Sequence, residues 1–294
     1  MRRSFMFKGF NITSRITEFA SLGEEGYKKY FDIGDDIKKK SISKVRPELE
    51  KYIDINGIID GEALQQDWFP EVVADVFISH SHKDVNDTIT LAGWLKEEFG
   101  LEAFIDSAVW GYANELLKQL DDKMSWIPER GIYSYEMRNN TTSHVHMMLS
   151  MALTKMIDRS EVVFFYNTPN SINSNGFGDT TFSPWIYNEI TMTKFIQKRD
   201  PGEHRKVKIT ESSEMKKAFN SLMQHRVDLD DLIILSKEDM NNWYQNFTFS
   251  QRYLNTNPGF FSFDERYGSS ILELHPLDVL YKLKADQIQK GVNV

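Results

Sequence analysis

The sequence predicts an α/β fold in which helices flank a parallel sheet, and three observations carry this prediction. Residues 74–78 (ADVFI) form a short apolar run typical of a buried parallel strand, which breaks abruptly into the polar turn 79–84 (SHSHKD). Apolar residues at helical spacing follow, and this pattern ends at Gly100. A second apolar run, 101–106 (LEAFID), then completes a strand–helix–strand unit.

The polar turn is the first candidate site. Ser79, His80 and Ser81 come directly after the first strand, and Asp84 is placed to cap the helix that follows. Asp106 ends the second strand. Because open α/β sheets bind ligands at the carboxyl ends of their strands, we expect these side chains to face a common ligand.

Two later elements extend the pattern. Residues 160–167 (SEVVFFYN) predict a third strand, and the segment 183–190 (SPWIYNEI) predicts a helix that begins at Ser183 or Pro184. Trp185 and Glu189 are one turn apart on this helix, so both can line one pocket. The free N–H groups at its start favour negatively charged ligand groups.

This order of elements resembles a Toll/interleukin-1 receptor (TIR) domain: a first strand of the type DVFIS, a second strand ending in Asp, an apolar third strand, and a helix with Trp and a Glu four residues later. The resemblance covers about residues 72–210 and implies a flavodoxin-like sheet. We therefore expect an N-terminal extension at 1–70, a TIR-like domain at 71–210 and a C-terminal helical extension at 211–294, with helices at 213–224 and from Ser236.

The interval between the second and third strands departs from the family pattern. Ordinary TIR domains hold one loop and one helix there, whereas residues 107–159 have room for an extended loop and two helices, from Val109 and from Ser143, with the insertion itself at about 107–142. We expect it to lie over the carboxyl ends of the strands and to shape the pocket or an assembly surface. Its candidate contact residues are aromatic: Trp110, Trp126, Tyr133 and Tyr135.

The resemblance also implies a chemistry. Many TIR domains cleave the nicotinamide ribosidic bond of NAD⁺, and Glu189 matches the glutamate on which they depend. A carboxylate near the ribose stabilises the oxocarbenium-like cation that forms when neutral nicotinamide departs. The expected substrate-binding residues are Ser79, His80, Ser81, Asp106, Trp110, Ser183 and Trp185. Asp106 would contact a ribose hydroxyl, and His80 and Ser81 would contact phosphate or adenosine.

These residues also have structural interpretations: Trp185 and Asp106 could serve packing and loop orientation, and His80 could stabilise its turn. His144 and His146 fit a cap and a packed side chain. NAD⁺ is the expected substrate, with no cofactor and no metal. The chain most resembles the stand-alone TIR proteins of bacteria, which act in anti-phage defence. This resemblance implies self-association and a sensor or effector protein as partners.

Two rival functions remain. His80, His82 and Asp84 spell H-x-H-x-D, the opening of a metallo-β-lactamase signature, but Val85 stands where that signature has His and the later ligands have no counterpart. The second rival is a non-enzymatic adaptor that acts through TIR–TIR association, in which Glu189 is a surface acid.

The amino-acid composition excludes several classes of function and location for this protein. A net charge of −8 argues against sequence-independent nucleic-acid binding, and the basic segment 37–46 (IKKKSISKVR) fits a solvated helix face. Cys is absent, which excludes disulfides and thiolate chemistry and fits a reducing cytoplasm. Because no apolar run is long enough to cross a bilayer, we expect a soluble cytoplasmic protein without membrane contact.

Overall fold

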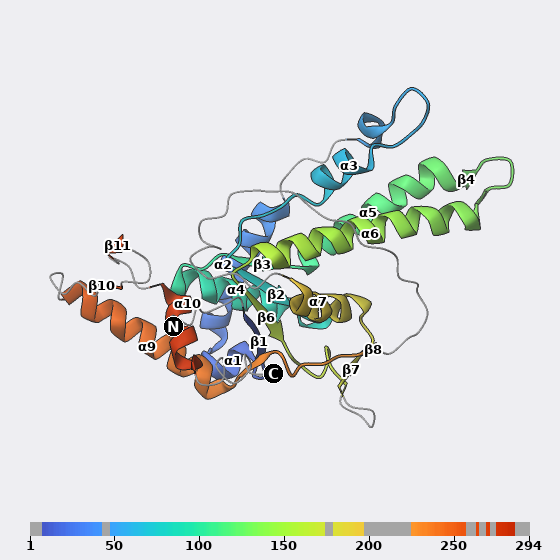
Figure 1. Cartoon of the computed structure of the whole chain (residues 1–294). Coiled ribbons are helices and arrows are strands. Elements are labelled where there is room, and N and C mark those ends of the chain that lie inside the picture. Colours follow the sequence, from blue (N-terminus) through green and yellow to red (C-terminus); the bar gives the residue numbers. More distant parts are fainter. Residues whose placement is uncertain are drawn as a thin grey trace.

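A five-stranded parallel sheet with helices on both faces organises the chain, which confirms the predicted α/β class (Figure 1). The computed structural model describes residues 8–42, 48–173, 179–196, 225–256, 263–264, 269–270 and 275–285. The sheet comprises β1 (Lys8–Ile12), β2 (Val76–Ser79), β3 (Ala103–Ile105), β6 (Val162–Tyr166) and β9 (Ile233–Leu235). Their order is β3-β2-β6-β1-β9, and every neighbouring pair is parallel.

The strand order differs from the flavodoxin-like order 2-1-3-4-5 in one respect. Strands β2, β3 and β6 have the expected arrangement, with β2 between the other two. The next position is taken by β1, from the N-terminal segment, and β9 follows at the edge. Both flanking segments therefore contribute strands to the sheet, although the sequence predicted no strand in either.

Strand alternation divides the interior into two apolar layers. Val76 and Ile78 of β2 face one core, whereas Phe77 faces the other. The first core contains residues of α1 (Ile16–Phe19), α4 (Val85–Phe99), α9 (Lys237–Thr256) and α10 (Pro276–Leu283). The second contains residues of the short 3₁₀ turn at Leu49–Tyr52, α3 (Gly61–Trp68), α5 (Ser107–Leu120) and α6 (Tyr135–Arg159).

Helix α2 (Glu24–Ile42) packs against α4 at two glycines. A Cβ atom on Gly34 would lie 1.8 Å from the Ile89 carbonyl oxygen, and one on Gly93 would lie 1.8 Å from the Tyr30 carbonyl oxygen. Because both atoms belong to backbone, neither neighbour can move aside. The two helix backbones can approach this closely only where neither helix has a side chain.

The insertion forms an arm of two helices that extends from the sheet (Figure 1). A π-helical turn at Asp121–Ser125 follows α5, and β4 (Trp126–Ile127) pairs antiparallel with β5 (Ile132–Tyr133). The second helix, expected from Ser143, begins earlier, at Tyr135. Ser134 caps the helix by accepting from Met137 N, and Arg138 and Thr141 hold its first turns against the end of α5 by donating hydrogen bonds to Asp121.

The remaining helices and strands complete the fold. Helix α7 (Pro184–Phe195) follows β6, and β7 (Thr180–Thr181) pairs with β8 (His225–Arg226). A two-stranded ribbon joins β10 (Phe263–Asp264) and β11 (Ser269–Ser270). The helix predicted at 213–224 lies outside the described residues. In the part of the chain that is described, every helix is too short or too polar to cross a membrane.

Candidate functional site

Two neighbouring strands deliver the first two residues of the site to the same level of one sheet face. Ile78 pairs with Ile105, so Ser79 and Asp106 follow at the next level, on the face that also carries Phe77 and Phe104. Adjacent strands are about 4.8 Å apart, so the two polar residues are neighbours. Both are buried, with exposed fractions of 1% and 3%.

Helix α7 crosses this face and places Glu189 against the strand ends. The Glu189 side chain is completely buried, and Ser79 Oγ donates a hydrogen bond to its Oε2 at 2.6 Å. Its other oxygen, Oε1, meets no hydrogen-bond donor in the described part of the chain. The Asp106 carboxyl group lies within hydrogen-bonding reach of Glu189. Two acidic groups therefore meet in a water-excluded position.

His80 completes the group from the start of the turn after β2. Its Nδ1 lies 2.7 Å from Asp106 Oδ1 and 3.4 Å from the Ile78 carbonyl oxygen, and its side chain is fully buried. Its Nε2 has no hydrogen-bond partner among the described residues. We call Ser79, His80, Asp106 and Glu189 the Glu189 cluster.

Burial and mutual charge set the ionisation of this cluster. Burial raises the pKa of Glu189 well above its usual range, and the Asp106 charge and a hydrogen bond with Asp106 raise it further, whereas the Ser79 hydrogen bond lowers it. Burial lowers the pKa of His80, but the charge of Asp106 and the hydrogen bond with it outweigh burial, so the pKa of His80 lies above its ordinary value. A neutral Glu189 beside a His80–Asp106 ion pair is consistent with both directions.

The cluster lies where the connections of the sheet diverge. The chain leaves β2 through α4, which packs in the first core, and leaves β6 through α7, which packs on the opposite face. The β2 connection leads to β3 and the β6 connection leads toward β9, in opposite directions along the sheet. The crevice at such a switch point is where open α/β sheets bind their ligands.

The other expected site residues lie outside the cluster. Ser81 caps the 3₁₀ turn His82–Asp84, and Ser183 caps α7 by accepting from Ile186 N at 3.3 Å. Trp185 is half-buried and packs against the second core, where its ring is nearly perpendicular to the His146 ring, with the ring centroids 5.5 Å apart. The Trp110 side chain lies outside the described part of the structure. The structure thus brings together Ser79, His80, Asp106 and Glu189, and does not add Ser81, Ser183 or Trp185 to them.

The H-x-H-x-D residues do not converge. His80 pairs with Asp106, His82 is exposed, and the Asp84 carboxylate accepts hydrogen bonds from Thr168 and Asn170. Within the described ranges, no group of three or more His, Cys, Asp or Glu side chains is placed to hold a metal ion.

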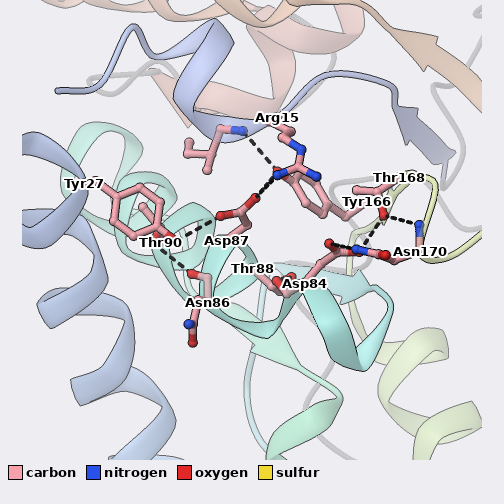
Figure 2. Close-up of polar contacts among 11 residues, drawn as sticks. Arg15, Tyr27, Asp84, Asn86, Asp87, Thr88, Thr90, Tyr166, Thr168 and Asn170 are labelled. Atoms are coloured by element: carbon pink, nitrogen blue, oxygen red, sulfur yellow. Dashed lines mark hydrogen bonds and ion pairs between the residues drawn. The ribbon is translucent and has the colours of Figure 1, made fainter. Parts of the chain in front are cut away.

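A second polar group at the carboxyl ends of the strands was not anticipated from the sequence (Figure 2). Asp84 accepts from Thr168 Oγ1 at 2.5 Å and from Asn170 Nδ2 at 2.7 Å. Asp87 accepts from Tyr27 at 2.9 Å and from Tyr166 at 3.4 Å, and Arg15 lies 3.9 Å from it. We call these residues the Asp84–Asp87 network. Its one sequence signal was the polar Thr-Pro-Asn turn after the third predicted strand.

A hollow of about 490 Å³ lies at the other end of the strands, near the amino ends of β2 and β3. Pro70, Val73, Lys96 and Glu102 are among its lining residues. No member of the Glu189 cluster lines it. Comparison with known proteins identified no matching family model, no matching curated protein and no matching solved structure.

Proposed function

We propose that this chain is a TIR-like enzyme that cleaves the nicotinamide ribosidic bond of NAD⁺, as a glycohydrolase or a cyclase, and that Glu189 is its catalytic residue. The observation that carries the proposal is the placement of Glu189: it is completely buried at the switch point of the sheet, yet Oε1 lacks a hydrogen-bond donor among the described residues. Buried polar groups are ordinarily hydrogen-bonded, and a catalytic role is one explanation for an exception. Acids whose pKa is shifted by burial and by a neighbouring charge are candidates for functional sites.

The charges of the cluster favour a substrate that becomes cationic. Two carboxyl groups and one imidazole meet in this cluster, so acidic groups outnumber basic ones among its four residues. When nicotinamide departs, positive charge develops on the ribose, and an ionised Glu189 in a low-dielectric site stabilises it strongly. Neutral nicotinamide leaves without a strong general acid, so one carboxylate suffices.

Catalysis requires the site to open. Ser79, His80, Asp106 and Glu189 are all at least nine-tenths buried, so a dinucleotide reaches Glu189 only when α7 or the turn after β2 moves. Closure around bound substrate then restores the water-excluded environment in which the carboxylate acts. The ribose replaces Ser79 as the nearest polar neighbour of Glu189 during turnover.

The wider assignment rests on the same resemblance. On that basis the proposed protein is a stand-alone bacterial TIR protein that is located in the cytoplasm. Its proposed role is anti-phage defence, with a sensor or effector protein as partner.

A second function, adaptor activity through self-association, is favoured by the tip of the arm. Apolar side chains are exposed there on the π-helical turn, on both strands and on the first turn of α6, and Tyr135 is 81% exposed. The set comprises Met124, Trp126, Ile132, Tyr133, Tyr135 and Met137. Clustered exposed apolar residues are a common feature of protein-binding surfaces.

The test is incubation of purified protein with NAD⁺, with products separated by chromatography and identified by mass spectrometry. Glu189→Gln should lower turnover by about 10²–10³-fold or more, because it removes the group that stabilises the ribosyl cation. Asp87→Asn, an isosteric change in the Asp84–Asp87 network, is the matched control and should keep activity. A folded Glu189→Gln variant with unchanged turnover would overturn the mechanism, and a wild-type protein that leaves NAD⁺ intact at every concentration would favour the adaptor.

A further inference from the structure

We propose that Glu189 and Asp106 share a single proton at neutral pH, and that Asp106 is the positioning residue that holds Glu189 neutral at rest and takes up its proton when Glu189 ionises. This inference deepens the proposed function and rests on it for its catalytic meaning. The shared proton itself is a property of the resting protein.

The geometry of the cluster requires a proton between the acids. Glu189 is completely buried and Asp106 is 3% exposed, so water does not solvate two adjacent negative charges. Ser79 supplies one hydrogen bond, to Glu189 Oε2, and Oε1 has no donor in the described chain. Two carboxyl groups in hydrogen-bonding contact cannot both be ionised at low cost, so one proton lies between them.

His80 decides which acid carries the negative charge at rest. Its Nδ1 lies 2.7 Å from Asp106 Oδ1, and no described contact joins it to Glu189. An imidazolium at this position stabilises a carboxylate on Asp106, so the proton resides on Glu189. The resting cluster is therefore a neutral Glu189 beside a compensated ion pair.

This arrangement allows Glu189 to ionise without losing a proton to solvent. A cationic substrate group near Glu189 favours the carboxylate form, and the proton then moves from the Glu189 carboxyl to the Asp106 carboxylate. The acid pair carries one proton and one negative charge before and after the transfer, so the buried site keeps its net charge. Asp106, after β3, is the titratable group that faces both Glu189 and His80. The charge of Asp84, at the start of α4, acts on His80.

Infrared spectroscopy of the whole chain without NAD⁺ tests the shared proton directly. A protonated carboxyl group has a C=O stretching band distinct from that of a carboxylate, and the band lost in Glu189→Gln reports Glu189. We expect this band to be present at neutral pH in the wild type. Asp106→Asn should move its titration midpoint to lower pH by about one unit or more, because the like charge is gone. Asp87→Asn is the control and should leave the midpoint in place.

His80→Gln is a second variant that should change the titration midpoint of Glu189, and it replaces Asp106→Asn if that variant does not fold. The His80→Gln change removes the positive charge beside Asp106 and so disfavours a second negative charge on Glu189, and the Glu189 midpoint should rise. Absence of a Glu189 band at neutral pH overturns the proposal, as does a midpoint that moves in neither variant. Because this readout needs no substrate, failure of NAD⁺ cleavage leaves the result intact, and the two proposals fail separately.

Discussion

Two groups of buried or partly buried acids lie at the carboxyl ends of the same sheet, and they differ in how fully their oxygens are hydrogen-bonded. In the Asp84–Asp87 network, both oxygens of Asp84 and both oxygens of Asp87 accept hydrogen bonds from side chains (Figure 2). In the Glu189 cluster, only one oxygen of Glu189 accepts a hydrogen bond from a described donor, Ser79. Its other described polar neighbour is the carboxyl group of Asp106. Satisfied acids stabilise a fold, whereas incompletely satisfied acids cost stability and indicate function.

The largest expected difference between the two groups is in the free energy of unfolding when one acid in each is replaced by its isosteric amide. Asp84→Asn should lower the free energy of unfolding by about 2 to 3 kcal/mol, because the carboxylate accepts from Thr168 and Asn170 and an amide can accept from only one of them. Glu189→Gln should change it by less than about 0.5 kcal/mol at pH 5, since an amide resembles a protonated acid. Urea unfolding monitored by circular dichroism measures both. Equal destabilisation by the two changes would erase the distinction.

The pH dependence of stability should come from the Glu189 cluster. The pKa of Glu189 lies above its ordinary value of 4.5 and the pKa of His80 above 6.5, so the folded state binds more protons than the unfolded state once the pH exceeds each ordinary value. The free energy of unfolding therefore falls as pH rises. The His80 contribution is complete below pH 6.5 and is lost as pH rises through its folded pKa. The Glu189 penalty begins above pH 4.5 and grows toward its folded pKa.

We expect a loss on the order of 1 to 2 kcal/mol between pH 5 and pH 8, with each proton contributing at most about 1.4 kcal/mol per pH unit. Glu189→Gln should flatten this dependence and become more stable than the wild type at pH 8. Asp87→Asn should keep the wild-type slope. Chemical denaturation at several pH values gives the slopes, and a Glu189→Gln slope equal to that of the wild type would show that Glu189 ionises normally in the folded state.

The local elements of this arrangement were predictable because their signals are local. The apolar runs that form β2, β3 and β6 and the helix that carries Glu189 are each encoded within one short window of sequence. The strands β1 and β9 were not predicted. The segment KGFNI is short and places Asn11 in a buried position, and its pairing partner β6 is about 150 residues away along the chain. Pairing at that separation leaves no periodic signal in β1 itself.

The sequence predicted which residues form the site, but it did not predict their burial or how they pair with one another. Strand ends indicated Ser79 and Asp106, and the resemblance indicated Glu189, but the sequence did not show that His80 pairs with Asp106 or that all four side chains are covered. Burial of Glu189 depends on how α7 packs across the sheet, which is a tertiary property. The partners of Asp84 were missed for a related reason, because Thr168 and Asn170 lie more than 80 residues away along the chain.

A smaller effect tests whether hydrogen bonding in the Asp84–Asp87 network is purely structural. The Tyr166 hydroxyl accepts from Ile16 N at 3.1 Å and donates to Asp87 at 3.4 Å, so it joins β6 to α1 and α4. Tyr166→Phe leaves the buried Ile16 N–H without this acceptor and should cost about 1 kcal/mol of unfolding free energy. The Glu189 infrared band should not shift. A shift of that band would mean that the two groups are coupled and the comparison is too simple.

The smallest expected effect on stability concerns the tip of the arm, where apolar side chains are exposed. Tyr135 is 81% exposed at the start of α6, so Tyr135→Ser should change the free energy of unfolding by less than about 0.5 kcal/mol. If the tip of the arm is the self-association surface, the same change should weaken assembly and lower NAD⁺ cleavage at low protein concentration in parallel. Ile55→Ser is the control, because Ile55 is fully exposed but belongs to the turn before α3. Sedimentation across a concentration series gives the association state, and a wild-type protein that stays monomeric during turnover would leave the arm a role in covering the site instead.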